Sequence, residues 1–378
     1  MRKIGLYLHF PFCKQKCHYC DFPSWAGRDD RKESYLRALF REMETYESIR
    51  NDYTVCTIYM GGGTPTLFDG DQLAFTLDQC RKCFNVEKDA EVSIECNPGT
   101  VDRQKLKTIA ASGFNRLSIG LQAWQDRHLE FLGRIHRHRH FEDTVDWAWE
   151  AGFTNISVDV ILGIPGQTSD EWRETLKNAV KSGVTHLSAY SLKIEEDTLL
   201  HHWLEKGVFR EMDDEQERKL YHEGIELLQS LGFKQYEISN FALEGFECRH
   251  NLNYWRNGEY IGCGCGAHSY FNSKRRGNVA DINAYIDRIH KGESAAGFDE
   301  EIDSKTEMFE TLMLAFRLKE GVRKKDFISR YGISFTDKYK REIELLKQQG
   351  LVEEDEESVF PTLLGLDMQN RIALAFLE

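Results

Sequence analysis

Three cysteines near the start of the chain are spaced so that they could bind metal together. Cys13, Cys17 and Cys20 directly follow an apolar run at residues 4–10. Pro11 ends that run, so we expect the thiols on a loop that leaves a buried strand. Three thiolates can hold three irons of a [4Fe–4S] cluster, which normally has four cysteine ligands. The fourth iron would then stay open to another ligand.

The same three cysteines could instead be structural or could bind zinc. Positions i, i+4 and i+7 share one face of a helix, so the thiols could form a core stripe. Zinc would need a fourth protein ligand, and His18 would face another direction if the loop were helical. Pro11 and Pro23 leave little room for a stable helix between them, which favours the cluster.

Six expected strands alternate with helices over the first 190 residues. The strands are expected at residues 4–10, 55–60, 91–95, 115–120, 156–161 and 185–190, and the helices at 30–50, 70–84, 102–112, 124–132, 141–151 and 169–182. This alternation predicts a parallel sheet with right-handed crossovers. In such folds chemistry collects at the carboxyl ends of the strands. Those ends carry the cysteine loop, residues 61–64, Glu95, Gln122 and Asp159.

The pattern changes beyond residue 200. A helix is expected at 214–231, a short strand at 235–239 and an unusual loop at 248–255. From about residue 303 the chain is expected to form helices and a two-stranded turn, ending in a helix at 365–377, which is typical of a small winged helix. The acidic turn at 353–357 argues against DNA as its partner.

Composition narrows the function further. A chain of 378 residues suggests about two domains, and a net charge of −13 argues against a broad nucleic-acid surface. No apolar run approaches the roughly 18 residues that span a membrane. The first residues lack a signal-peptide pattern, so we expect a cytoplasmic protein. Ten cysteines in that compartment favour metal or cluster binding over disulfides. Composition leaves peripheral membrane contact and a homodimer open.

Several motifs together resemble the radical S-adenosylmethionine (SAM) superfamily, and within it the HemN-like branch. The motifs are the cysteine loop with its leading residues 7–13, the Gly-Gly-Gly-Thr-Pro-Thr run at 61–66, and the stretches at 95–100, 118–122, 132–134 and 159–168. The resemblance covers essentially the whole chain. It implies an α/β fold, a partial (β/α)6 TIM-type barrel of the radical SAM kind, with a small C-terminal α/β extension and a winged-helix-like C-terminal domain. The expected domains are residues 1–200, 201–300 and 301–378.

The resemblance also implies the cofactors. Cys13, Cys17 and Cys20 would bind a [4Fe–4S] cluster, and its open iron would take the amino and carboxylate groups of SAM. An electron donor would reduce the cluster, and one electron passed into the sulfonium would give a 5′-deoxyadenosyl radical. The residues implied to contact SAM are Tyr7, Tyr19, Gly62, Gly63, Thr64, Glu95, Gln122, Arg134 and Asp159. Taken singly, each charged residue among them is equally well explained by a structural salt bridge.

Two departures choose between members of the branch. Oxygen-independent coproporphyrinogen III dehydrogenases have a fourth cysteine where this chain has Phe22, and they carry a long N-terminal extension, whereas the first strand here starts within four residues of Met1. Residues 250–255 match the HNxxYW motif of the haem chaperones in the branch. We therefore expect a haem chaperone, with haem as cargo and haem proteins such as respiratory enzymes as acceptors. The dehydrogenase is the alternative, and a radical enzyme with another substrate is a third.

Haem would be bound by residues of that motif. His250 is the candidate axial ligand, because a neutral imidazole binds haem iron, and Tyr254 and Trp255 could stack on a porphyrin face. Cys248 and the pair Cys263 and Cys265 are rival thiolate ligands. Other cysteines and histidines are expected to be structural: Cys80 and Cys83 as buried or half-buried thiols in a helix, and His136, His138 and His140 as the solvated start of a helix.

Overall fold

One large mixed sheet forms the centre of the computed structural model, which describes residues 1–377. Its middle is the parallel series β1 (Arg2–Phe10), β4 (Tyr53–Gly62), β5 (Val86–Cys96), β6 (Arg116–Gln122), β7 (Asn155–Leu162) and β8 (His186–Ser191). These are the six predicted parallel strands, in their order along the chain. The linear order is that of a partial barrel.

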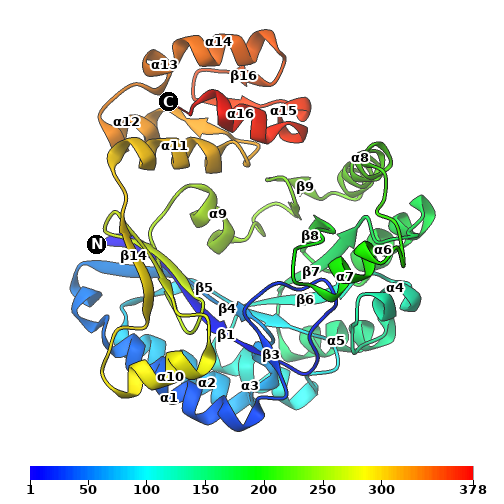
Figure 1. The fold of residues 1–378 in the computed structure, drawn as a ribbon, viewed down its shortest axis with the longest axis vertical. Coiled ribbons are helices and arrows are strands. Elements are labelled where there is room, and N and C mark those ends of the chain that lie inside the picture. Colours follow the sequence, from blue (N-terminus) through cyan, green and yellow to red (C-terminus); the bar gives the residue numbers. More distant parts are fainter. Residues whose placement is uncertain (378) are drawn as a thin grey trace.

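Helices connect these strands and cover the outer face of the sheet (Figure 1). They are α1 (Lys32–Glu44), α2 (Gly70–Cys83), α3 (Arg103–Ser112), α4 (Asp126–Phe131), α5 (His138–Ala151) and α6 (Ser169–Lys181). Each lays an apolar stripe on the strands; in α1 the stripe includes Tyr35, Leu39 and Met43, all fully buried. Every residue of β6 is buried, as expected for a strand covered on both faces.

The sheet continues beyond β1 through a later part of the chain. Strand β11 (Tyr260–Cys263) pairs parallel with β1, and β12 (His268–Phe271), β13 (Lys274–Asn278) and β14 (Ala296–Glu301) follow in antiparallel order. Helix α10 (Ile282–His290) packs against α1. At the opposite end, β10 (Asn240–Ala242) and β9 (Lys234–Gln235) pair antiparallel beyond β8, after α7 (Leu199–Glu205) and α8 (Asp214–Ser230).

Two sequence expectations for this region were wrong. The strand expected at 235–239 ends at Gln235, and Glu237 makes only a single bridge to Leu318. The loop expected at 248–255 is instead the helix α9 (Arg249–Trp255). The buried carboxylate of Glu91 stabilises the start of α9, since it accepts hydrogen bonds from the N–H groups of Arg249 (3.0 Å) and His250 (3.0 Å).

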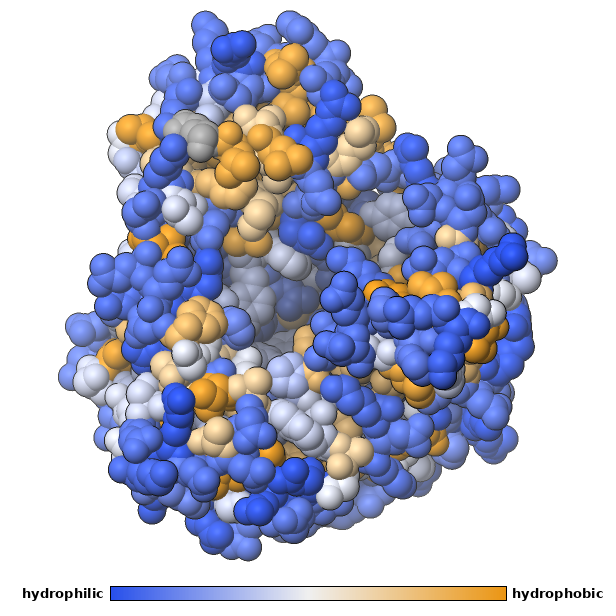
Figure 2. Space-filling view, in the orientation of Figure 1, coloured by the Kyte–Doolittle hydropathy of each residue, from blue (hydrophilic) through white to orange (hydrophobic). Residues whose placement is uncertain are grey.

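The C-terminal elements form a separate apolar core and stand at one end of the molecule (Figure 1). They are α11 (Ser304–Ala315), α12 (Lys324–Tyr331), α13 (Phe335–Lys338), α14 (Lys340–Gln348), α15 (Leu363–Asp367) and α16 (Gln369–Ala375), with β15 (Val322–Arg323), β17 (Ser358–Pro361) and β16 (Val352–Glu354) in one antiparallel sheet. This arrangement is winged-helix-like. Glu378, the last residue of the predicted third domain, lies outside the described residues. The space-filling view is hollowed between these elements and the main sheet (Figure 2).

The helices are too short or too polar for a membrane span. Among residues 1–377 none combines the length and the apolar character that crossing a bilayer requires.

Candidate functional site

The cysteine loop is irregular in structure and is held by hydrogen bonds to the end of α4. Its first residues form β2 (Phe12–Cys13), which pairs with β3 (Trp25–Ala26), and no helix follows through Cys20. The backbone N–H of His18 donates to Leu132 O (3.0 Å), and its Nδ1 lies 2.8 Å from Phe131 O. Because the loop is not helical and the three thiols are partly exposed, the cysteines do not form a helical core stripe.

The three thiols open into one cavity of about 550 Å3, which we call the cluster cavity. Residues at the carboxyl ends of the parallel strands form its wall. The lining includes Cys13, Cys17, Tyr19, Cys20, Phe22, Tyr59, Gly62, Gly63, Thr64, Glu95, Asn97, Arg116, Ser118, Gln122, Arg134 and Asp159. The fold thus brings together the three cysteines and every residue predicted to contact SAM, except Tyr7.

The positions of the three cysteine thiols bear on the kind of metal group that they could hold. No three His, Cys, Asp or Glu side chains among residues 1–377 converge closely enough to hold one metal ion. A cluster offers a separate iron to each thiolate, so it fits cysteines that face one cavity without meeting at a point. Burial raises the pKa of the Cys13 thiol, and raises that of Cys20 to about 11. Ligation would therefore release protons from both.

The glycine run is explained by packing inside the protein. Gly62 has a φ of +106°, and a Cβ there would overlap the His9 ring. A Cβ on Gly63 would lie 2.7 Å from Phe10 O. These contacts require glycine whether or not a ligand is bound. The glycine run therefore shapes the wall of the cluster cavity, and by itself it is no proof of a ligand.

Two carboxyl groups face the cluster cavity. Glu95 accepts hydrogen bonds from the N–H of Gly62 (3.0 Å) and the hydroxyl of Tyr59 (3.1 Å). Burial, and next the charge of Asp159, raise the pKa of Glu95 to about 7. Burial also raises the pKa of Asp159, which accepts from the Ser118 hydroxyl at 3.4 Å. A cationic ligand between these groups would favour their ionised forms.

Arg134 connects the cysteine loop with the strand ends. Its Nη1 donates to Cys17 Sγ (3.4 Å), and its Nη2 donates to Gly120 O (3.0 Å) and to the side-chain oxygen of Asn97. The Asn97 amide in turn donates to Thr64 Oγ1 (2.8 Å). Sequence reasoning missed Asn97 as a site residue, although it lies within the 95–100 motif.

A second missed residue is Arg116, which lines the cluster cavity from the start of β6. Its side chain is 2% exposed, and its Nε has no hydrogen-bond partner among the described residues. The signal in the sequence was a charged residue at the start of an otherwise apolar strand.

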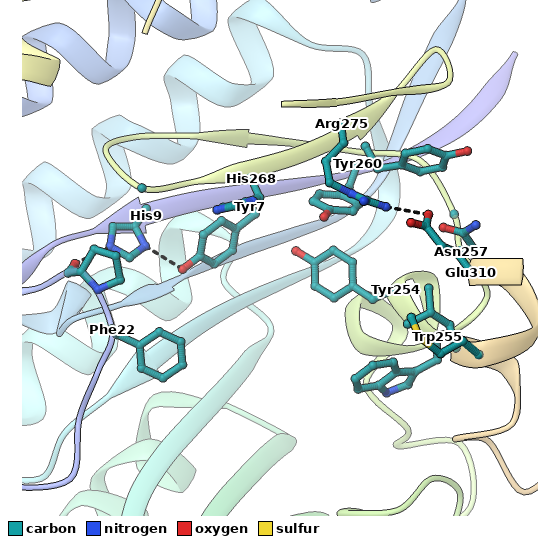
Figure 3. A pocket seen from close by; sticks show the side chains of 16 residues that line it. Tyr7, His9, Phe22, Tyr254, Trp255, Asn257, Tyr260, His268, Arg275 and Glu310 are labelled. Carbon is teal, nitrogen blue, oxygen red and sulfur yellow. Dashed lines mark hydrogen bonds and ion pairs between the residues drawn. The ribbon is translucent and has the colours of Figure 1, made fainter. Parts of the chain in front are cut away.

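A second cavity of about 670 Å3, which we call the aromatic pocket, lies between the β11–β13 extension and α11. Figure 3 shows Phe22 on one side of this pocket and Tyr254 and Trp255 on the other. Its lining includes Tyr7, His9, Phe22, Tyr254, Trp255, Tyr260, His268, Tyr270, Arg275, Glu310, Met313 and Leu314. Phe22 lines both cavities, so the two sites adjoin.

Tyr7 belongs to the aromatic pocket rather than to the cluster cavity. Its hydroxyl lies 2.9 Å from His9 Nδ1 on the pocket side, and its ring stacks on that of Tyr59 with the centroids 6.3 Å apart. Tyr59 thus stands between Tyr7 and Glu95. Tyr7 therefore lines the aromatic pocket and not the cluster cavity, and its contact with SAM stays a prediction.

His250 lies outside both cavities. Its Nδ1 is 2.8 Å from Thr57 Oγ1 and its Nε2 is 2.8 Å from the Tyr254 hydroxyl, so both ring nitrogens have partners. The side chain is 1% exposed, and burial lowers its pKa to about 3. Of the predicted haem residues, the fold brings Tyr254 and Trp255 to a pocket and keeps His250 in the core. The rivals Cys248, Cys263 and Cys265 are fully buried as well.

The remaining histidines and cysteines divide differently from expectation. His136 was expected in a solvated position, but it is buried, with Nε2 at 3.2 Å from Leu121 O. At the start of α5, His138 is partly exposed and His140 is exposed, as expected. Cys80 and Cys83 are buried in α2, which confirms that expectation.

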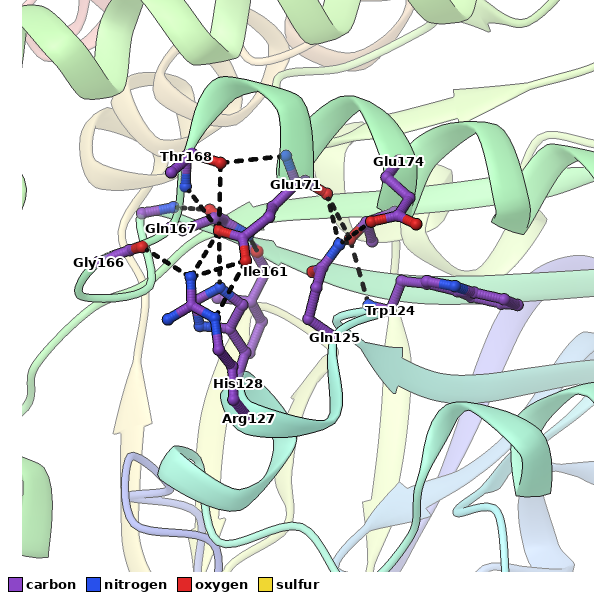
Figure 4. Close-up of polar contacts among 12 residues, drawn as sticks. Trp124, Gln125, Arg127, His128, Ile161, Gly166, Gln167, Thr168, Glu171 and Glu174 are labelled. Atoms are coloured by element: carbon purple, nitrogen blue, oxygen red, sulfur yellow. Dashed lines mark hydrogen bonds and ion pairs between the residues drawn. The ribbon is translucent and has the colours of Figure 1, made fainter.

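The end of the 159–168 motif starts a helix rather than lining a cavity (Figure 4). Thr168 is the N-cap of α6, and its hydroxyl accepts from the N–H of Glu171 (3.3 Å). The Glu171 carboxylate accepts from Arg127 at 2.6 Å and lies 3.3 Å from His128 Nε2, which lowers the pKa of Glu171 to about 2. This network fixes α4 against α6 beneath the cysteine loop.

Comparisons with known proteins identify the class. The Radical SAM superfamily model matches residues 7–179, and the HemN C-terminal domain model matches residues 302–368. The solved structure of coproporphyrinogen III oxidase (HemN) from Escherichia coli, a radical SAM enzyme, superposes with a TM-score of 0.86, covering 99% of this chain and 90% of that one at 22% identity. The fold and the cysteine loop therefore define a radical SAM protein.

Curated relatives narrow the class to one family. The chain is 35% identical to the heme chaperone HemW of Bacillus subtilis (strain 168) over 372 residues, which cover 98% of each chain. It is 34% identical to the heme chaperone HemW of Escherichia coli (strain K12) over 339 residues, covering 87% of this chain and 86% of that one. The chain belongs to the HemW family.

Proposed function

We propose that this protein is a haem chaperone built on the radical SAM fold, which binds a [4Fe–4S] cluster and SAM and delivers haem to haem proteins. The observation that carries the proposal is the similarity to HemW relatives over nearly the whole chain. Two features support it. The cysteine loop and the wall of the cluster cavity come together at the strand ends, and an aromatic pocket adjoins them at Phe22.

Cys13, Cys17 and Cys20 would hold the cluster. When bound, such a cluster supplies one open iron for the amino and carboxylate groups of SAM and an electron for its sulfonium. Glu95 and Asp159 would attract the positive charge of SAM or accept from its hydroxyls. Arg134 holds Cys17 in place through a contact of 3.4 Å to its sulfur, and it holds Asn97 in place through a hydrogen bond to the side-chain oxygen. Domain limits at residues 200 and 300 stay a proposal.

The partners follow from the same proposal. A reductant protein would supply electrons to the cluster, and haem proteins such as respiratory enzymes would accept the cargo. All ten cysteines are free thiols, which is the state expected in a reducing compartment. We therefore keep the cytoplasm as the proposed location.

Phe22 favours a haem chaperone over a coproporphyrinogen III dehydrogenase. It occupies the position of the fourth cysteine of the dehydrogenases, and its side chain is 59% exposed between the two cavities. An apolar ring there offers no thiol for chemistry on a porphyrinogen.

The test uses full-length protein reconstituted with iron and sulfide without oxygen. Haem is titrated in and followed by absorbance, and the loaded protein is then mixed with an apo haem protein. Stoichiometric uptake followed by transfer is expected. If the protein took up no haem and instead converted coproporphyrinogen to protoporphyrinogen in a SAM-dependent reaction, it would be a dehydrogenase and the chaperone proposal would be wrong.

A further inference from the structure

One histidine of the aromatic pocket has free ring nitrogens. His268, the first residue of β12, is exposed, and neither of its nitrogens has a hydrogen-bond partner among residues 1–377. Its ring makes one edge contact, with Phe298, at a centroid distance of 5.5 Å. Figure 3 shows the imidazole next to Tyr7 at the wall of the pocket.

The ring nitrogens of the other two candidate histidines already have hydrogen-bond partners. His9 lines the same pocket, but its Nδ1 is 2.9 Å from the Tyr7 hydroxyl and its Nε2 is 2.8 Å from Pro23 O. His250 is bound through both nitrogens in the core. A metal ligand must offer an unshared nitrogen lone pair, and only His268 among these three does so as folded.

We propose that haem is carried in the aromatic pocket, with a ring nitrogen of His268 as the axial ligand of its iron. This inference rests on the proposed haem-chaperone function and names the site of the cargo. Binding forms one coordination bond, in which the neutral imidazole donates its lone pair to iron and displaces a water or other weak ligand. No electron is transferred and no proton is lost.

The pocket suits the porphyrin ring in size and chemistry. Its volume of about 670 Å3 falls within the roughly 300–1,000 Å3 of small-molecule sites. Aromatic side chains on both sides can stack on a flat macrocycle: Phe22 on one side, Tyr254 and Trp255 on the other. Met313 and Leu314 of α11 add apolar surface, so a ring that is poorly soluble in water gains by entering.

A charged group is present for the propionates. Arg275 lines the pocket, and its Nη2 donates to Glu310 at 2.6 Å. A guanidinium has five N–H donors in one plane, so donors remain for a carboxylate. The side chain is 34% exposed, so these donors can be reached from solvent. An apolar interior beside one partly exposed guanidinium, which is paired with Glu310, matches the amphipathic shape of haem.

The test compares histidine variants of the full-length protein by titration with ferric protoporphyrin IX. The variants are His268→Ala, His250→Ala and, as a matched control, His290→Ala, which removes an exposed histidine at the end of α10. We expect His268→Ala to weaken haem binding at least about tenfold and to lose the absorbance and electron-paramagnetic signature of nitrogen-ligated iron. Added imidazole should restore that signature, and His290→Ala should match the wild type.

Metal-free protoporphyrin IX separates ligation from packing. It should bind the wild type and His268→Ala equally, because it has no iron to coordinate. Unequal binding would make His268 a packing residue and overturn the ligand assignment. The assignment would also be overturned if His268→Ala kept the wild-type signature while His250→Ala lost it and regained it with added imidazole. In that case the chaperone function would stand, with His250 as the ligand. A wild type that takes up no haem would remove the function itself.

Discussion

Arg134 Nη1 lies 3.4 Å from Cys17 Sγ, and the same guanidinium donates to Asn97 and Gly120. One side chain thus connects the cysteine loop to the ends of β5 and β6. In the proposed loaded protein, a cation this close to a ligating thiolate would stabilise the bound cluster by Coulomb attraction. Without a cluster, the Arg134 guanidinium still donates to two partly buried acceptors, the side-chain oxygen of Asn97 and the Gly120 carbonyl.

Arg134→Leu should weaken both roles. The apoprotein should lose about 1–3 kcal/mol of unfolding free energy, because the Asn97 and Gly120 oxygens lose their donor. Reconstituted protein should hold less iron. Urea unfolding and iron analysis measure the two effects, with the exposed Arg137→Leu as control. Unchanged stability in Arg134→Leu would show that water replaces the guanidinium.

Cys13→Ser should abolish the cluster and leave the fold intact. Cys13 is partly exposed and its Sγ lies 3.7 Å from Thr64 Oγ1, so the hydroxyl fits the same space. We expect the visible absorbance and the bound iron and sulfide to disappear after reconstitution. Cys80→Ser, in the buried part of α2, should keep its iron. A full complement of iron in Cys13→Ser would exclude this cysteine as a ligand.

Gly63→Ala should disturb the wall of the cluster cavity. The added methyl would meet Phe10 O at 2.7 Å and Phe12 O at 2.8 Å, both backbone atoms that cannot rotate away. A destabilisation of about 1–3 kcal/mol is expected from such overpacking, with reduced cluster content. Gly297→Ala, where the nearest atom would be 3.4 Å away, is the control. Equal unfolding midpoints for the two variants would contradict this account.

Glu95 should make stability depend on pH. Its pKa is raised from 4.5 to about 7 by burial and Asp159. A raised carboxyl pKa means that the folded state holds the proton more tightly, so the stabilisation is complete below pH 4.5 and is lost as the pH rises through 7. Relative to Glu95→Gln, the unliganded wild type should lose stability over that window. Parallel stability curves for the two proteins would show that Glu95 does not titrate there.

The same carboxyl predicts how SAM binding changes with pH. The positive charge of SAM favours the ionised form of Glu95, so SAM should bind more tightly as the pH rises through about 7. Calorimetric titration of cluster-loaded protein on either side of that pH measures the effect. Glu95→Gln should flatten the profile. A wild-type affinity for SAM that is constant across this range would show that Glu95 does not interact with SAM.

Local patterns in the sequence were enough for the parallel sheet. Period-2 and period-3.6 hydropathy marks strands and helices wherever burial is regular, and the six strands formed in the predicted order. The same pattern failed at α9, because its start is stabilised by Glu91, a residue about 160 positions earlier. No local signal reports such a partner.

The site residues show the same limit. Strand-end polar residues such as Glu95 and Asp159 met in one cavity because parallel strands share an edge. The orientation of a ring could not be inferred in this way. Tyr7 faces the extension, and His250 is held in the core by Thr57 and Tyr254. Which nitrogen of a histidine stays free depends on tertiary hydrogen bonds, so His268 drew no attention in the sequence.

The pairing of β1 with β11 has a consequence for biosynthesis. Gly5 lies opposite Tyr260 and Leu8 opposite Cys263, so one edge of the strand that leads into the cysteine loop stays open until residues 260–263 have left the ribosome. Contacts this distant in sequence form slowly, and an open apolar edge invites pairing with other chains. The nascent chain therefore carries an aggregation-prone edge through most of its synthesis. Truncation before β11 should yield insoluble protein even though all three cysteines are present.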